Sequence, residues 1–128
     1  MATDLRRTHG ELGERIAADH LEHRGYEILA RNFRTRYGEL DLVAADERAL
    51  VFCEVKTRIA GRFGGPAGPL DAIGQRKRDR LRRMATQWLA ETQDGSRPRR
   101  RELRFDAIGV MLTSAGRLLA LEHLENAF

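Results

Sequence analysis

The segment 38–56 limits the possible folds more than any other part of the chain. Two short apolar runs, within residues 38–44 and 50–56, are rich in leucine, valine and phenylalanine, and a short polar break separates them. Runs of this length and composition, bounded by turn residues, are typical of buried β-strands. The connection is too short to hold a crossover helix, so we expect the two strands to pair in antiparallel fashion.

Three ionisable residues stand inside these apolar strands. Asp41 lies in the first strand, and Glu54 and Lys56 lie in the second. Because side chains alternate along a strand, Glu54 and Lys56 share one face and stand roughly 6–7 Å apart. Charged groups are costly inside a packed sheet unless they are paired or bind a metal. Two interpretations stay open: a hydrolytic metal site, or a salt bridge between Lys56 and one acid with the other acid exposed.

The metal interpretation has a definite chemistry. Phosphodiester hydrolysis needs a hard cation that polarises a phosphoryl oxygen and lowers the pKa of an attacking water. Mg²⁺ is held through one or two carboxylates while it keeps several waters, and Asp41 and Glu54 on neighbouring strands supply such ligands. The ammonium group of Lys56 can orient the water or offset the charge that builds on the phosphorus. We therefore expect Mg²⁺ or Mn²⁺ as the cofactor.

The rest of the pattern predicts a single α/β domain with the order α-β-β-β-α-β-β. Helices are expected at 8–24 and 71–91, and strands at 26–34, 39–45, 49–57, 103–112 and 117–122. Because a long helix separates the third and fourth strands, these two can lie parallel within a mixed sheet. The 128 residues fit one domain over 1–128, with residues 1–7 expected to be flexible.

A stretch dominated by glycine and proline follows the third expected strand. It runs from Gly61 to Pro69 and cannot form regular structure, so we expect a mobile loop over 59–70. A loop of this length in a compact domain is usually mobile or functional. Its place after Glu54 and Lys56 allows two interpretations, a flap that gates the substrate or a plain disordered connection.

Two charged residues interrupt the apolar faces of the expected helices. Glu14 lies at the border of the first apolar face, where the helix meets the sheet, and it either points into the acid site or is an ordinary flanking glutamate. Lys77 lies within the apolar stripe of the second helix. Its ammonium group either reaches a phosphate or a carboxylate, or extends to solvent over an apolar stem.

The charge balance favours an anionic partner. The net charge is +4 and the isoelectric point is about 10.0, which favours nucleic acid over a membrane surface. The cationic residues of the second helix are Arg76, Lys77, Arg78, Arg80, Arg82 and Arg83, and Arg97, Arg99, Arg100 and Arg101 follow it. Such clusters suit a phosphate backbone, although a run of charges is more often a solvated face.

The location of the protein is expected to be the cytoplasm. The chain has no run long enough to span a bilayer, and its first ten residues lack the apolar core of a signal peptide. The single cysteine, Cys53, excludes an internal disulfide and fits a reducing compartment. Its place within an apolar strand favours a small buried hydrophobe over a catalytic thiol.

Several short motifs together resemble a known family. They are Gly13-Glu14, Arg31-Asn32-Phe33, Gly38-Glu39-Leu40-Asp41, Phe52-Cys53-Glu54-Val55-Lys56-Thr57-Arg58 and Arg104-Phe105-Asp106. On these residues the chain resembles the YraN-like proteins of bacteria, a family of predicted endonucleases. Through that family it is similar to the archaeal Holliday-junction resolvases of the PD-(D/E)xK nuclease superfamily. The resemblance implies a restriction-endonuclease-like domain with a mixed central sheet flanked by helices.

The resemblance also implies roles for individual residues. Asp41 and Glu54 would bind the metal together with the backbone carbonyl of Val55, Lys56 would be the catalytic lysine, and Glu14 would be the helix acid of the resolvase-like branch. Leu40 stands where the superfamily has a proline, and Cys53 stands where it usually has a valine. Neither departure affects the acids. The candidate nucleic-acid contacts are Arg58, Arg76, Lys77, Arg80 and Arg83.

These observations predict a metal-dependent endonuclease that acts on DNA, with branched or structured DNA among the candidate substrates. The alternative is a catalytically weak nucleic-acid-binding module, or an adaptor that has the nuclease fold. The similarity to resolvases implies a two-fold homodimer, because a four-way junction needs two matched cuts. The apolar C-terminal segment 118–128 either forms that interface or folds back onto its own domain.

Overall fold

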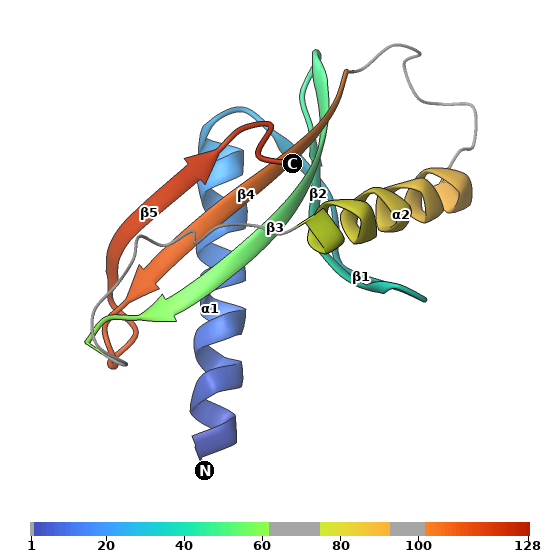
Figure 1. Ribbon diagram of the computed structural model, residues 1–128. Coiled ribbons are helices and arrows are strands. Elements are labelled where there is room, and N and C mark those ends of the chain that lie inside the picture. The colour runs from blue at the N-terminus through green and yellow to red at the C-terminus, as the bar shows by residue number, and fades with distance from the viewer. Residues whose placement is uncertain (1, 62–74, 93–101) are drawn as a thin grey trace.

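The computed structural model of the chain describes residues 2–61, 75–92 and 102–128, with side chains for 7–61, 78–92 and 102–128 (Figure 1). The two helices are α1 (Ala2–His23) and α2 (Gln75–Thr92), and the five strands are β1 (Glu27–Thr35), β2 (Gly38–Ala45), β3 (Ala49–Ile59), β4 (Glu102–Leu112) and β5 (Leu118–Leu124). This order of elements and the α/β fold class are those predicted from the sequence. Among the described residues, no helix has both the length and the apolar character needed to cross a membrane.

The five strands form one mixed sheet in the order β1-β2-β3-β4-β5. β1, β2 and β3 form an antiparallel meander, β3 and β4 are parallel, and β5 pairs with β4 in antiparallel fashion. The predicted parallel pairing of the third and fourth strands is therefore confirmed. The arrangement is consistent with a nuclease-like fold.

Several element boundaries differ from the predicted ones. Helix α1 begins at Ala2 rather than at residue 8, so the segment 2–7 that we expected to be flexible is helical. Strand β3 continues to Ile59, because it stays paired with β4 along its whole length. Residues 62–70 of the expected mobile loop lie outside the described residues.

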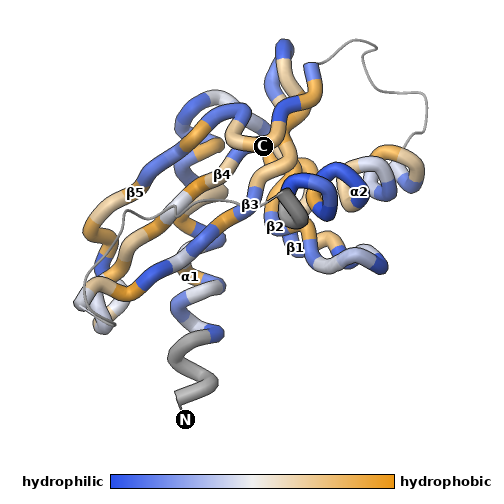
Figure 2. Tube along the Cα trace, in the orientation of Figure 1, coloured by the Kyte–Doolittle hydropathy of each residue, from blue (hydrophilic) through white to orange (hydrophobic). Residues whose placement is uncertain are grey.

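The sheet buries both faces, because alternate residues of its strands pack under different helices. α1 covers one face, and its Ala17, Ala18 and Leu21 pack with Leu42, Ala44, Val51 and Cys53. On the other face α2 packs with Val43, Leu50 and Phe52 through Leu81, Met84 and Trp88. Figure 2 shows hydrophobic segments (orange) along the strands and a hydrophilic turn (blue) between β2 and β3. Cys53 is fully buried, as predicted for a small hydrophobe.

The C-terminal residues return to the sheet after β5. The backbone N–H of Ala127 donates to the carbonyl of Phe105 at 2.8 Å, and Phe128 packs against the apolar cluster beneath α2. This part of the tail therefore folds back onto its own domain. Leu118 and Leu119 remain about half exposed on the edge strand β5, and the homodimer stays a prediction.

A buried ion-pair network ties the C-terminal end of the chain to the rest of the fold. Asp106 is completely buried and accepts hydrogen bonds from the guanidinium of Arg104, from His123 Nε2 at 2.8 Å and from the backbone N–H of Asn126 at 2.9 Å. Arg104 also donates to the Tyr26 hydroxyl at 2.7 Å. Burial alone would raise the pKa of Asp106, but these hydrogen bonds and the charge of Arg104 hold it below its usual value.

We expect Asp106→Asn to destabilise the fold by roughly 3 kcal/mol near pH 7, because it removes the buried carboxylate at 2.8 Å from Arg104 and leaves only the more exposed Glu125 at 3.7 Å. Glu102→Gln is the control, since Glu102 is exposed on the same strand. Because the pKa of Asp106 is lowered by folding, its ionised form stabilises the protein above pH 3.8 and loses that effect as the pH falls below this value. Urea unfolding of the three proteins at pH 7 and near pH 3.5 measures both effects. Equal stability of Asp106→Asn and wild type at pH 7 would contradict the expectation.

Candidate metal centre

Strands β2 and β3 separate at the position of the predicted acids. Their ladder runs from Ala45 opposite Leu50 to Leu42 opposite Cys53 and ends there. Asp41 and Glu54 would form the next pair. Instead, the backbone N–H of Val55 donates to Asp41 Oδ2 at 2.8 Å. The Asp41 carboxylate thus takes the place of a strand partner in the gap between the two strands.

The regular alternation of side chains is interrupted at the same place. Leu42 packs beneath α1 and Leu40 packs beneath α2, although residues two apart on a regular strand share a face. On β1, Leu40 is opposite Phe33, and Asn32 next to it has a φ of 51°. This left-handed conformation is uncommon outside glycine, and asparagine is among the residues that tolerate it best. The irregular backbone brings both Asn32 and Asp41 into one side-chain cluster.

Three carboxylates meet in this cluster. Glu14 from α1 and Glu39 and Asp41 from β2 each offer one oxygen atom, and these atoms lie within 4.8 Å of one another. The Asn32 amide nitrogen, in the orientation that suits both neighbours, donates to Glu14 Oε2 and Glu39 Oε1 at 2.8 Å each. Asn32 therefore fixes the separation of two of the three acids.

Burial and the crowding of negative charge raise the pKa values of two acids in the cluster. The pKa of Asp41 is raised to about 7, first by burial and then by the charges of Glu14, Glu54 and Glu39, while the Val55 hydrogen bond opposes the shift. The pKa of Glu14 is also raised, by burial and by Glu39. A cation would relieve this repulsion. The donors are all oxygen atoms, which is the set that Mg²⁺ and Mn²⁺ prefer, so the residues fit a hard divalent cation.

The position of Glu14 depends on a close contact between α1 and β3. A Cβ atom at Gly13 would lie 2.9 Å from Thr57 Cβ and would overlap Thr57 Oγ1. Real Cβ atoms do not come so close, so only glycine lets the helix approach the strand at this point. The residue that follows, Glu14, is thereby brought down to the level of the sheet.

The predicted site residues divide between the two faces of β3. Val55 packs in the cluster beneath α1, so the alternation along the strand directs Glu54 and Lys56 to the opposite face. Glu54 still lies near enough for its charge to raise the pKa of Asp41. The N–H of Val55 points into the gap, and the C=O of the same residue points to the same neighbouring strand, as in an antiparallel pair. Its carbonyl is thus directed toward the acids.

The sequence interpretation missed Glu39. Glu39 and Asp41 are two residues apart in an expected strand, and residues at this spacing share a face. That spacing was sufficient to place Glu39 beside Asp41. The role of Asn32 had no comparable signal, because its left-handed backbone is not visible in the sequence.

The predicted nucleic-acid contacts are only partly described. Arg80 and Arg83 are exposed on α2, and α2 packs against the β1–β2 turn, where Arg80 Cδ and Met84 Sδ approach Gly38. Arg58 is half-buried on β3. The side chains of Arg76 and Lys77 lie outside the described residues.

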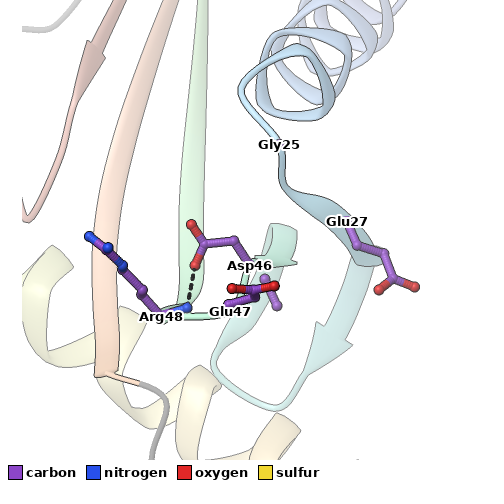
Figure 3. A pocket seen from close by; sticks show the side chains of 6 residues that line it. Gly25, Glu27, Asp46, Glu47 and Arg48 are labelled. Atoms are coloured by element: carbon purple, nitrogen blue, oxygen red, sulfur yellow. Dashed lines mark hydrogen bonds between the residues drawn. The ribbon is translucent and has the colours of Figure 1, made fainter.

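A separate hollow of about 430 Å³ lies at the other end of β2, between the start of β1 and the β2–β3 turn (Figure 3). It is lined by Gly25, Glu27, Ala45, Asp46, Glu47 and Arg48. Asp46 Oδ1 already accepts hydrogen bonds from the N–H groups of Arg48 and Ala49, at 2.8 and 2.7 Å. Asp46 therefore stabilises the turn, and the hollow is distinct from the carboxylate cluster.

Comparison with known proteins identifies the family of the chain. Residues 13–110 match the model of the Uncharacterised protein family UPF0102. The chain belongs to this family. The YraN-like resemblance seen in the sequence motifs is thus confirmed. The matched region includes Glu14, Glu39, Asp41 and the whole of β3.

Three relatives illustrate the extent of the similarity. A UPF0102 protein of Nocardia farcinica is 46% identical over 119 residues, which is 93% of this chain and 87% of the relative. One of Frankia casuarinae is 47% identical over 93% of this chain and 94% of its own length. One of Mycolicibacterium vanbaalenii is 54% identical over 89 residues, which is 70% of this chain and 71% of the relative.

We expect Gly13→Ala to destabilise the protein by about 1–3 kcal/mol, because the added methyl group forces α1 away from Thr57. Divalent-metal affinity should fall as well, since Glu14 moves with the helix. Gly10→Ala is the matched control: it lies on the same helix with no atom within 4 Å of an added Cβ, and it should stabilise by up to about 1 kcal/mol. Thermal unfolding and metal titration of both variants test this. If Gly13→Ala is as stable as wild type, the contact between α1 and Thr57 adjusts to the added methyl group at little cost.

We expect Asp41→Asn to stabilise the metal-free protein at pH 8 by on the order of 3 kcal/mol more than at pH 4. Folding raises the pKa of Asp41 from 3.8 to about 7. The unfolded chain therefore loses this proton at lower pH than the folded protein does, and the wild type loses stability as the pH rises from about 4 to 7. Asparagine removes this loss. Urea unfolding of both proteins in a chelator across that pH range measures it, and a pH-independent difference would contradict the assignment.

Proposed function

We propose that the protein is a metal-dependent endonuclease that hydrolyses phosphodiester bonds of DNA, with Mg²⁺ or Mn²⁺ as its cofactor. The observation that carries the proposal is the convergence of Glu14, Glu39 and Asp41, whose oxygen atoms lie within 4.8 Å of one another. The gap between β2 and β3 directs the backbone of Val55 to the same place. Three acids held together at such an electrostatic cost are explained by a bound cation.

The residues of the cluster would have different roles in binding the cation. Asp41, Glu39 and Glu14 would bind the cation with the Val55 carbonyl, and Asn32 would hold Glu14 and Glu39 at a fixed separation. A bound Mg²⁺ or Mn²⁺ polarises a phosphoryl oxygen and lowers the pKa of an attacking water. Because the pKa of Asp41 is about 7, this residue gives up its proton when a cation binds near neutral pH.

Glu54 and Lys56 are assigned to the substrate side of the gap. They share the face of β3 that is opposite α1, and Glu54 acts electrostatically on Asp41. An ammonium group in this position can offset the negative charge that develops on the phosphoryl group. Lys56 is therefore proposed as the catalytic lysine.

DNA is the proposed partner because of the basic helix next to the cluster. Arg80 and Arg83 are exposed on α2, which packs against the turn leading to Glu39. Within the described part of the chain, neither arginine forms an ion pair with a carboxylate. Exposed guanidinium groups of this kind bind phosphates and release counterions.

The proposal is tested by calorimetric Mn²⁺ titration and by cleavage of a fluorescently labelled branched DNA with Mg²⁺ or Mn²⁺. We expect wild type to bind the metal and cut, and Asp41→Asn and Glu39→Gln to lose metal affinity and at least 100-fold in cleavage rate. Glu47→Gln is the matched control, because Glu47 is an exposed acid near the far end of β2. It should behave as wild type.

Glu54→Gln and Lys56→Ala extend the same experiment to the other face of β3. Both should abolish cleavage, and Lys56→Ala should leave metal affinity nearly unchanged because lysine is not a metal ligand. The contrary result is DNA binding that needs no metal, shows no cleavage and is the same in wild type and in Asp41→Asn. It would reject the nuclease proposal in favour of a catalytically weak binding module.

A further inference from the structure

The turn between β1 and β2 carries a tyrosine that is flanked by two guanidinium groups. Tyr37 is 36% exposed. The guanidinium carbon of Arg36 lies over its ring, 5.4 Å from the ring centre, and that of Arg83 from α2 also lies over it, at 5.6 Å. Two segments far apart in the sequence thus place cations around one exposed aromatic ring.

The turn that holds Tyr37 is rigid. The hydroxyl of Thr35 donates to the carbonyl of Gly38 at 2.8 Å and accepts a hydrogen bond from the N–H of Tyr37 at 3.0 Å. Gly38 has a φ of +132°, and Met84 Sδ and Arg80 Cδ of α2 lie 3.7 and 3.8 Å from the position that a Cβ would take there. These contacts support the backbone that carries the ring.

The charges around the ring have no acidic partners among the described residues. Neither Arg36 nor Arg83 forms an ion pair there, whereas Arg34 of β1 pairs with Glu39 at 3.9 Å. Tyr37 precedes Glu39 by two residues, which is roughly 7 Å along the chain. An aromatic surface with two available cations thus lies beside the carboxylate cluster.

We propose that Tyr37, together with Arg36 and Arg83, is a stacking platform for an unpaired nucleobase. The inference rests on the proposed function and narrows it: the substrate would be DNA with a single-stranded or frayed segment next to the phosphate that is cut. Unpaired bases stack on aromatic rings and guanidinium planes, and arginines bind the adjoining phosphates. A base inside an intact duplex cannot reach the ring, so duplex DNA would contact the arginines but not Tyr37.

The platform predicts a difference between two DNA probes. One is a duplex with a single-stranded overhang that contains 2-aminopurine, a fluorescent base whose emission changes on stacking. The other is a blunt duplex with the same base inside. Binding is measured in a chelator, so that no cleavage occurs. For wild type we expect tighter binding to the overhang probe and a change in its emission.

Substitutions of Tyr37 separate stacking from charge. Tyr37→Leu should weaken binding to the overhang probe by roughly fivefold or more and remove the change in emission, while binding to the blunt duplex stays the same. Tyr37→Phe keeps the ring and should behave as wild type. Arg83→Gln should lower the salt dependence of binding to both probes by about one unit of slope. Arg117→Gln, on the distant β4–β5 turn, is the control for loss of one exposed positive charge.

The platform is overturned if Tyr37→Leu weakens binding to both probes equally, or if Tyr37→Phe behaves as Tyr37→Leu. It is also overturned if wild type binds neither probe. Thermal unfolding of the Tyr37 variants confirms that each is folded. The result is independent of cleavage. If wild type prefers the overhang probe, the preference needs the Tyr37 ring and no metal-dependent cutting occurs, the stacking proposal stands and the nuclease proposal is rejected. If metal-dependent cutting occurs without that preference, the nuclease proposal stands and the stacking proposal is rejected.

Discussion

The separation of β2 from β3 at Asp41 is the constraint on which the rest of the site depends. A continuous ladder would pair the Val55 N–H with the backbone of β2 and leave no room for a carboxylate. Because the ladder stops at Leu42, Asp41 accepts that hydrogen bond with its side chain. Glu39 and Glu14 then converge with Asp41 on the same gap. The acids are thus organised by a break in secondary structure within an otherwise continuous sheet.

The sheet tolerates this break because its other connections are strong. β3 is paired with β4 over its whole length, and β1 is paired with β2 up to the turn. On β4, opposite Cys53 and two strands from Asp41, the buried Asp106 accepts hydrogen bonds from Arg104, His123 and the backbone of Asn126. These hydrogen bonds hold the pKa of Asp106 below its usual value, whereas burial and the neighbouring acids raise the pKa of Asp41. The sheet thus holds one well-satisfied buried carboxylate on β4 and, two strands away, a group of carboxylates that repel one another.

The sequence was sufficient for the parts of this structure that follow regular periodicity. Apolar runs and turn residues located every strand, and the long helix between two strands explained their parallel pairing. The left-handed Asn32 and the interrupted alternation at Asp41 could not be predicted, because they are departures from that periodicity. Tyr26 reaches Arg104 and His123 reaches Asp106 from distant segments, and no local pattern indicates such contacts.

The parallel pairing of β3 with β4 has a consequence for the order in which the molecule folds. Ala49 of β3 pairs with Glu102 of β4, so this pairing must close a long loop, whereas the β1–β2–β3 meander forms through short turns. Local contacts form faster because they cost less loop-closure entropy. The meander already contains Asn32, Glu39, Asp41 and Val55. Most of the cluster can therefore assemble in the nascent chain, before the C-terminal half of the sheet has been synthesised.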